Sequence, residues 1–355
     1  MSVLIGGWGE VTILRYLQVV RETILSRMMT ARTRRICGFR PRLGMAILLW
    51  AAGPLQAQAP AVRTMGTAVV LTPPGMYFMA PRWSPSGGTL AVSGPQYGGI
   101  HLVTYPGGEV TELADEPAAG VNLVWSPTGE YILTSVSRYV NHRRRNALVV
   151  FDVLTGARTH LTEFVAGGAG HAIWDSGGQF LHLVTKGGKH RQFDARRELA
   201  EVEPGPFPQA RPVLTPGNQI VLLDPAAGGR KVIDSVAGRK LNLTVSPDGK
   251  RIAFEIVGGH LWVTAIDGGR AVDLGAGSRP AWSPGSERLA YIITEDDGHR
   301  ILAADVYAIN ADGTGKVNVS RSAEVFEMHP HWSPDGRHIA WDDLHSGRIY
   351  VQEVR

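Results

Sequence analysis

The sequence predicts an all-β fold in which one four-stranded antiparallel unit is repeated, and three observations support this prediction. A short motif, most often Trp-Ser-Pro-Asp-Gly followed by an apolar run, recurs along the chain. Glycine-containing turns separate short apolar runs inside each repeat, as tight hairpins require. No run of ten or more residues after residue 60 has the periodicity of a helix.

The repeated motif places turn-forming residues between two strands. Its last copy reads "MHPHWSPDGRHIAW", where proline, aspartate and glycine form the turn. Six copies align on one position, which is tryptophan in five of them. The aligned residues are Trp83, Trp125, Trp174, Val245, Trp282 and Trp332. Because a large aromatic side chain recurs at one place in the unit, we expect it to pack between neighbouring units.

The spacing of the aligned positions gives the size of the repeat. The intervals are 42, 49, 71, 37 and 50 residues, and most suit a four-stranded blade of about 40 to 45 residues. The clearest unit contains the strands "LNLTVS", "KRIAFEI", "HLWVTAID" and "RAVDLG". Units of this kind predict a closed β-propeller, a ring of antiparallel blades around a central channel.

The 71-residue interval between Trp174 and Val245 decides the predicted number of blades. It contains six strand-like runs, whereas one blade would need three and two blades would need seven. The segment "ARPVLTPGN" around Leu214 has the form of a degenerate motif. The sequence therefore favours seven blades over six, by a narrow margin.

The two ends of the repeat region predict how the ring closes. The last unit ends at "RIYVQEVR", its third strand, and so lacks an outer strand. The segment "GTAVVLTPPG" precedes the first inner strand in the same way that "GKVNVSRSAE" precedes the last. We expect residues 67–71 to complete the last blade, which would remove an open sheet edge.

The excess of basic residues comes from the first 59 residues. They hold eight arginines and two glutamates, and the remaining chain holds 28 basic and 30 acidic residues of the totals of 36 and 32. The basic balance therefore gives no reason to expect nucleic acid as a partner. Residues 28–59 have the features of a signal peptide: an arginine-rich start, a twelve-residue apolar stretch and Ala57-Gln58-Ala59. Residues 1–27 are interpreted as an over-extended start or an untidy extension.

This leader predicts an exported protein, periplasmic or secreted, with residues 60–355 as a single domain. Twelve apolar residues are too few to span a bilayer stably, so we expect no stable membrane span after cleavage. A retained single anchor is the alternative. The only cysteine, Cys37, lies in the leader, so the core alone must hold the domain together. We expect a monomer.

The repeats resemble the TolB-type family of WD40-like β-propellers over roughly residues 66–355. The resemblance implies blades around a channel, usually in an exported protein. About twenty residues separate the leader from the first blade, so the α/β domain that precedes the propeller of TolB is missing here. Propellers of this repeat family also precede serine peptidase domains and occur as oligogalacturonate lyases. The sequence contains no Gly-x-Ser-x-Gly motif, which argues against a complete hydrolase of that kind.

Histidines gather on one predicted face, where loops enter the inner strands and join the second strands to the third. Eight of the twelve histidines fall on this face or near it. Neutral imidazoles bind divalent cations, so His171, His329 and His331 are candidate ligands of one divalent metal. His171 and His329 are also candidate catalytic residues of a metal-dependent polysaccharide (uronate) lyase or hydrolase. The alternative is that these histidines are solvated turn residues, with no cofactor, because most of them should spread around the ring.

Three further groups on this face are candidate binding residues. Arg143, Arg144 and Arg145 at a hairpin tip either bind an anionic partner or form a solvated tip, and the solvated tip is favoured. Phe78 and Met79 either form an exposed apolar cluster for a protein partner or seal the closing strand. Tyr97 lies in a loop between second and third strands.

No complete catalytic constellation is present in the sequence. We therefore expect a non-catalytic platform that binds a protein or polysaccharide on the channel face, with the lyase or hydrolase as the alternative.

Overall fold

The structure, a computed structural model, describes residues 59–355 except for the gaps 186–187, 207–210, 215–217, 225–228 and 234–235. The predicted extension and all but the last residue of the predicted signal peptide lie outside these residues. The chain from residue 58 to residue 355 is one compact unit. No helix in the described part of the chain is long and apolar enough to cross a membrane.

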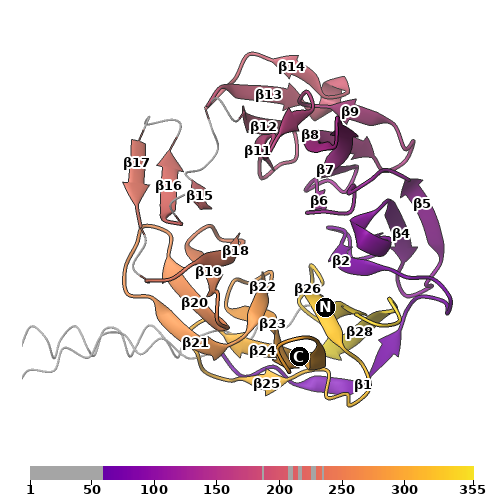
Figure 1. The fold of residues 1–355 in the computed structure, drawn as a ribbon, viewed down its shortest axis with the longest axis vertical. Coiled ribbons are helices and arrows are strands. Elements are labelled where there is room, and N and C mark those ends of the chain that lie inside the picture. Colours follow the sequence, from indigo (N-terminus) through magenta and orange to yellow (C-terminus); the bar gives the residue numbers. More distant parts are fainter. Residues whose placement is uncertain (1–58, 186–187, 207–210, 215–217, 225–228, 234–235) are drawn as a thin grey trace, which may run out of the picture. The chain divides into compact units, whose positions relative to one another are not determined.

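The described residues form seven antiparallel sheets that follow one another around a ring (Figure 1). Sheet 1 contains β2 (Met79–Trp83), β3 (Thr89–Ser93), β4 (Ile100–Thr104) and β5 (Val110–Ala114). Sheet 2 contains β6 (Val124–Trp125), β7 (Tyr131–Val140), β8 (Arg143–Asp152), β9 (Arg158–His160) and β10 (Val165–Ala166). Sheet 3 contains β11 (Gly170–Trp174), β12 (Phe180–Thr185), β13 (His190–Asp194) and β14 (Ala200–Val202).

Sheets 4 to 7 complete the ring. Sheet 4 has three strands, β15 (Arg211–Leu214), β16 (Ile220–Asp224) and β17 (Gly229–Val232). Sheet 5 contains β18 (Lys240–Val245), β19 (Arg251–Ile256), β20 (His260–Ala265) and β21 (Val272–Ala276). Sheet 6 contains β22 (Ser278–Trp282), β23 (Arg288–Asp296), β24 (Ile301–Asn310) and β25 (Val317–Asn318). Sheet 7 contains β26 (Glu327–Trp332), β27 (His338–Asp343), β28 (Ile349–Val354) and β1 (Thr64–Val70).

These strands confirm the all-β fold predicted from the repeats. The helical elements among the described residues are two short 3-10 turns, η1 (Pro95–Tyr97) and η2 (Ala195–Arg197). The three strands of sheet 4 lie where the sequence has its degenerate motif around Leu214. Apart from β1 in sheet 7, each sheet consists of strands that follow one another in the sequence.

The N-terminal strand closes the ring, as predicted. β1 pairs antiparallel with β28, and Val69 lies opposite Val351. Backbone hydrogen bonds between Arg63 and Arg355, with N···O distances of 2.8 and 2.9 Å, extend the ladder. The strand begins three residues before the predicted segment, at Thr64. Pairing to β1 therefore leaves β28 without an open edge.

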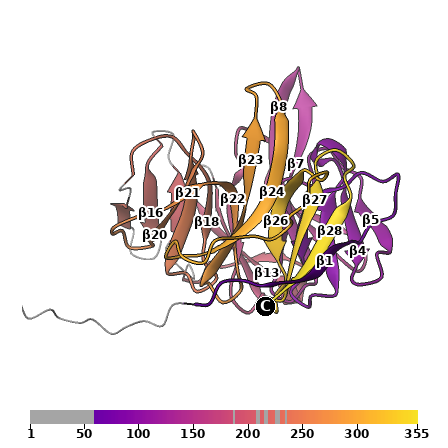
Figure 2. The same cartoon turned by 90° about the horizontal axis from the view of Figure 1, so that it is seen from below.

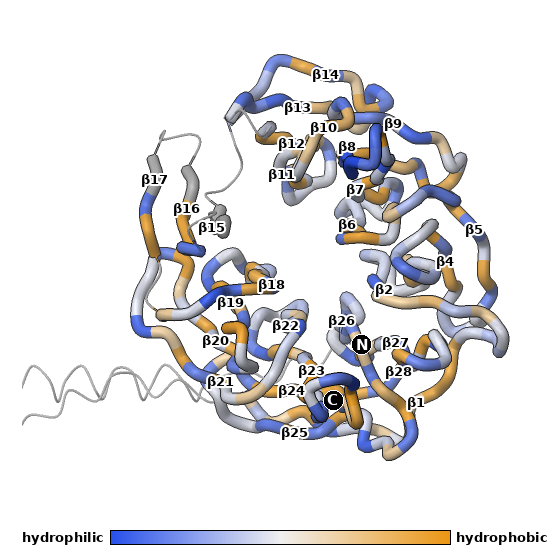
Figure 3. Tube along the Cα trace, in the orientation of Figure 1, coloured by the Kyte–Doolittle hydropathy of each residue, from blue (hydrophilic) through white to orange (hydrophobic). Residues whose placement is uncertain are grey.

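The hydrophobic core lies between neighbouring sheets. One cluster contains Phe78, which precedes β2, and Trp83 of β2, together with Ala340 and Val351 of sheet 7. Apolar residues recur along the strands around the ring (Figure 3). Hydrogen bonds from two motif tryptophans also cross between sheets. Trp125 Nε1 donates to the carbonyl of Arg82 at 3.0 Å, and Trp282 Nε1 donates to the carbonyl of Thr244 at 3.3 Å.

Four of the inner strands have a bulge three residues before the aligned motif position. The register shifts there in β2, β18, β22 and β26. The residues at this position have positive φ angles: Ala80 54°, Asn242 47°, Arg279 55° and His329 46°. Non-glycine residues seldom adopt this conformation, which costs about 1 kcal/mol or more. The bulge changes the direction of the inner-strand side chains.

Candidate functional site

A cavity of about 760 Å³ lies between the inner strands of sheets 1, 2, 5, 6 and 7. This volume is within the range of about 300 to 1,000 Å³ that small-ligand sites occupy. The bulge positions contribute directly to its lining, through Ala80, Asn242, Arg279 and His329. The shared strain of these positions is therefore located at the cavity, as is common at binding sites.

Three residues from two sheets form a hydrogen-bonded chain at the cavity. His329 Nδ1 lies 2.9 Å from Asp342 Oδ1, and His329 Nε2 lies 3.0 Å from the Tyr97 hydroxyl. Asp342 and His329 are buried, and Tyr97 is half-buried. The carboxylate accepts a hydrogen bond from the N–H at Nδ1. In a neutral imidazole, Nε2 then has no proton and accepts a hydrogen bond from the tyrosine hydroxyl. These hydrogen bonds hold the His329 imidazole in one orientation and connect η1 to β26.

Two buried carboxylates also connect neighbouring sheets beside the bulges. Asp342 Oδ1 accepts a hydrogen bond from the backbone N–H of Ala80 at 3.1 Å. Glu255 of sheet 5 has the same role two repeats earlier. It accepts a hydrogen bond from the side chain of Asn242 and another from the backbone N–H of Arg279, at 3.0 Å. Each carboxylate thus fixes the bulge residue of its own sheet and the bulge of the next sheet.

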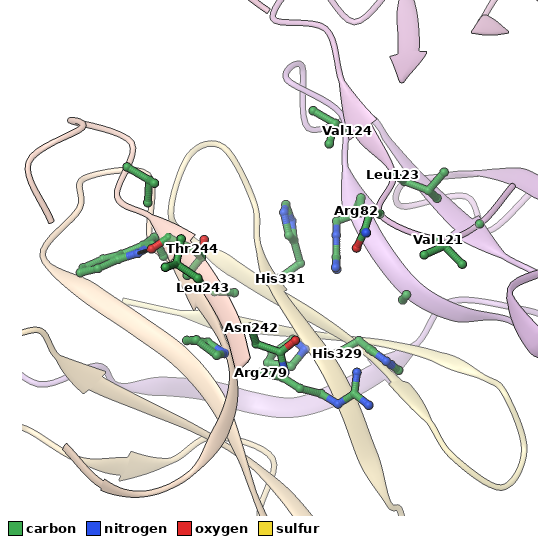
Figure 4. Close-up of a pocket in the computed structure, with 18 of the residues that line it drawn as sticks. Arg82, Val121, Leu123, Val124, Asn242, Leu243, Thr244, Arg279, His329 and His331 are labelled. Carbon is green, nitrogen blue, oxygen red and sulfur yellow. Dashed lines mark hydrogen bonds between the residues drawn. The ribbon is translucent and has the colours of Figure 1, made fainter. Parts of the chain in front are cut away.

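His331 and Arg82 extend into the cavity side by side (Figure 4). The backbone N–H of Trp83 donates to His331 Nδ1 at 3.3 Å, so the ring proton lies on Nε2. Burial lowers the pKa of His331 to about 3, and the positive charge of Arg82 adds to the shift. His331 is therefore a neutral hydrogen-bond donor at ordinary pH.

The electrostatic character of the cavity is set by Arg82 and Arg279. Burial lowers the pKa of Arg82, the negative charge of Asp342 opposes this shift, and the charge of Arg279 adds to it. An arginine nevertheless remains protonated in a protein. In the part of the chain that the structure describes, no lining residue of this cavity is acidic. Within the same residues, no carboxylate forms an ion pair with either guanidinium.

The structure brings together some of the candidate residues and separates others. Tyr97, His329 and His331 lie at the cavity, and His171 of β11 is not among its lining residues. Among the residues described, no group of three or more His, Cys, Asp or Glu side chains is arranged to hold a metal ion. The imidazoles of His329 and His331 already bond Asp342 and the Trp83 backbone through Nδ1.

The other candidate binding residues lie away from the cavity. Arg143, Arg144 and Arg145 begin β8 at the tip of the long β7–β8 hairpin. Phe78 is buried and packs with Val351 of β28, which corrects the expectation that it contributes to an exposed cluster. It instead seals the closing strand, the alternative that the sequence left open. Met79, at the start of β2, is half-buried.

The sequence analysis did not identify the two cavity arginines or the carboxylates behind the bulges. Arg82 comes directly before the motif tryptophan Trp83, and Arg279 comes three residues before Trp282. Aligning the repeats at these two positions would have shown polar residues in otherwise apolar inner strands. Asp342 and Glu255 are likewise at one aligned position, ten residues after Trp332 and Val245.

Glu327, at the start of β26, predicts a pH dependence of stability. Its side chain is 1% exposed, and its Oε2 has no hydrogen-bond partner. Burial raises its pKa to about 7, and the nearby charge of Asp305 adds to this, against a hydrogen bond from Ser322. The folded state therefore holds this proton more tightly than the unfolded chain does. This contribution to stability is complete below the unfolded pKa of about 4.3 and is lost as the pH rises through about 7.

We expect Glu327→Gln to raise the melting temperature at pH 8 and to leave it nearly unchanged at pH 4. The gain in the free energy of unfolding at pH 8 should be on the order of 3 kcal/mol. Thermal unfolding of both proteins across this pH range measures it. The exposed Glu324→Gln is the matched control and should change neither value. The wild type should lose stability relative to Glu327→Gln as the pH rises from 4 to 8. A constant difference would contradict the raised pKa of Glu327.

Comparisons with known proteins identify the fold. No protein-family model matches the chain. The chain is similar to the β-propeller domain of Cps50 (Swd1) from Myceliophteria thermophila, with 13% identity, a TM-score of 0.54, and coverage of 81% of this chain and 100% of that chain. TolB from Acinetobacter baumannii is 19% identical with a TM-score of 0.48, over 73% of this chain and 57% of that chain. At these identities the likeness shows a β-propeller fold alone.

One curated protein is similar over a short segment. It is the uncharacterized peptidase YuxL of Bacillus subtilis, 42% identical over 60 residues, which are 16% of this chain and 9% of that protein. The chain thus matches less than a tenth of the length of this relative. A match of this length carries no activity with it.

Proposed function

We propose that this protein is a non-catalytic binding platform that holds a protein or polymer partner on the face where the inner strands begin. One observation carries the proposal: the cavity lies among the inner strands, below two hairpins that project from this same face, and its two arginines form no ion pair with a carboxylate of the described residues. β7 and β8 continue past β6 to Val140 and Arg143, and β23 continues past β22 to Asp296. Figure 2 shows both hairpins rising above the other strands.

The hairpin tips add contact surface beside the cavity. Tyr139 is 72% exposed near the tip of β7–β8, beside the exposed Arg143 and Arg144. The β23–β24 tip carries the exposed acids Asp296 and Asp297. Tyrosine and arginine are enriched where proteins bind partners, which supports an interaction face here.

The second function considered from the sequence, a uronate lyase or hydrolase, has less support. It would act through His171 or His329. His171 does not line the cavity, and both ring nitrogens of His329 already bond Asp342 and Tyr97. We further propose that the protein is a monomer and is exported through residues 28–59, so that its partner lies in the periplasm or outside the cell. Fractionation of cells that produce the full chain tests the export.

Photo-crosslinking locates the binding face. A benzophenone amino acid replaces Val124 at the cavity, Tyr139 at the hairpin tip, or Leu154 in the β8–β9 turn on the opposite face. Leu154 is 94% exposed and is the matched control. We expect one common crosslinked species from the first two positions and none from the third. Equal crosslinking at all three positions, or crosslinking at Leu154 alone, would contradict the proposal.

A further inference from the structure

The geometry points to an acidic peptide segment as the ligand of the cavity, with its carboxylates bound by Arg82 and Arg279. This inference rests on the proposed binding function and names the chemistry of the partner. Arg82 projects from β2 and Arg279 from the bulge of β22, so two different sheets present their guanidinium groups to one space. The two charges are close enough for Arg279 to lower the pKa of Arg82.

The nearby carboxylates do not neutralise these arginines by contact. Asp342 is engaged by His329 and the Ala80 backbone, and Glu255 by Asn242 and the Arg279 backbone. Both carboxylates are buried, behind the layer of side chains that lines the cavity. Burial removes part of the hydration of the Arg82 guanidinium, and the charge of Asp342 opposes this effect without an ion-pair contact. A bound carboxylate would replace the lost hydration through charge-assisted, bidentate hydrogen bonds.

Neutral donors around the arginines suit the same ligand. His331 keeps its proton on Nε2, because its Nδ1 accepts from the Trp83 backbone. Asn122 and Asn242 add side-chain amides to the lining. A carboxylate has room for about four hydrogen bonds, so two arginines with neutral donors beside them can satisfy it fully.

The rest of the lining favours a peptide over an acidic sugar. Val124 and Val245 are exposed apolar side chains at the cavity, and Pro247 and Pro280 lie beside them. A polyuronate carries hydroxyl groups along its length, and these would lose water against such a surface without gaining partners. A segment that alternates acidic and apolar side chains matches both parts of the lining.

The test uses the full-length protein and a fluorescently labelled decapeptide of alternating glutamate and valine. Fluorescence anisotropy measures its affinity for the wild type and for Arg82→Gln, Arg279→Gln and the double variant. We expect a loss of about tenfold for each arginine and about a hundredfold for the pair. The double variant Arg196→Gln/Arg197→Gln removes the same charge from the exposed turn η2, away from the cavity, and should bind within about twofold of the wild type. The corresponding glutamine–valine peptide should bind at least tenfold more weakly to the wild type.

Each other outcome overturns the inference in a recognisable way. Equal loss in the Arg196→Gln/Arg197→Gln control would show binding to basic charge in general. Tight binding of an oligogalacturonate with no binding of the peptide would replace the peptide by an acidic sugar. No binding of either probe, while crosslinks still form at Val124, would reject the anionic ligand and leave the platform intact. If the arginine variants unfold, the salt dependence of the wild type is the test. Its affinity for the glutamate peptide must fall as the salt concentration rises, and an affinity independent of salt would overturn the inference.

Discussion

Replacing β1 (Thr64–Val70) with a seven-residue glycine–serine segment is expected to open the ring and make the protein aggregate. The replacement removes the side chains that hold β1 in register on β28, so the N–H and C=O groups of β28 face solvent as an unpaired edge. Losing about half a dozen backbone hydrogen bonds costs on the order of 5 kcal/mol. Many domains have little more total stability than this. Size-exclusion chromatography and thermal unfolding measure the result.

The control for this experiment keeps the strand and changes one exposed side chain in it. Val69 is largely exposed and lies opposite Val351. Val69→Thr should unfold at nearly the wild-type temperature, because threonine also favours strands. A glycine–serine variant that stays monomeric with an unchanged melting temperature would show that closure by β1 is dispensable.

The fold was predictable because its signals are local and repeated. Turn residues and alternating apolar residues lie within a few positions of one another, so each unit can be recognised alone. Closure followed from counting strands in the last unit. The start of β1 was not predictable, because Gly66 interrupts the strand-like run and the residues before it are placed by pairing with β28. The partner strand thus sets a boundary that the segment itself does not encode.

The candidate site was predictable only in part, because its contacts join distant repeats. Tyr97 and His329 are 232 residues apart in the sequence and meet because the first and last sheets are neighbours in the ring. The direction of Arg279 depends on a bulge, which reverses the alternation expected of a regular strand. Phe78 lies in a segment whose apolar residues suggested exposure, but it packs against β28.

Asp342→Ala is the second change for which we expect a large effect, a loss of about 3 kcal/mol in the free energy of unfolding. Asp342 is 1% exposed and accepts hydrogen bonds from His329 Nδ1 and the Ala80 backbone. Removing it leaves two buried donors without an acceptor, at the junction between sheets 7 and 1. Chemical denaturation of the wild type and the variant measures the loss.

Two further variants separate the role of the acceptor atom from that of the charge. Asp342→Asn keeps an Oδ1 to which both donors can bond, so it should recover most of the lost stability. Asp335→Ala removes an exposed carboxylate from the β26–β27 turn, where it accepts hydrogen bonds from Ser333 Oγ and the Arg337 backbone, and should cost only about 1 kcal/mol.

Glu255→Ala should repeat the Asp342→Ala effect at the junction of sheets 5 and 6, because Glu255 bonds the equivalent bulge residues. If the alanine variants at Asp342 and Glu255 were no less stable than Asp335→Ala, the buried carboxylates would not be what fixes the bulges. The strained conformation of His329 and Arg279 would then need another source of stabilisation.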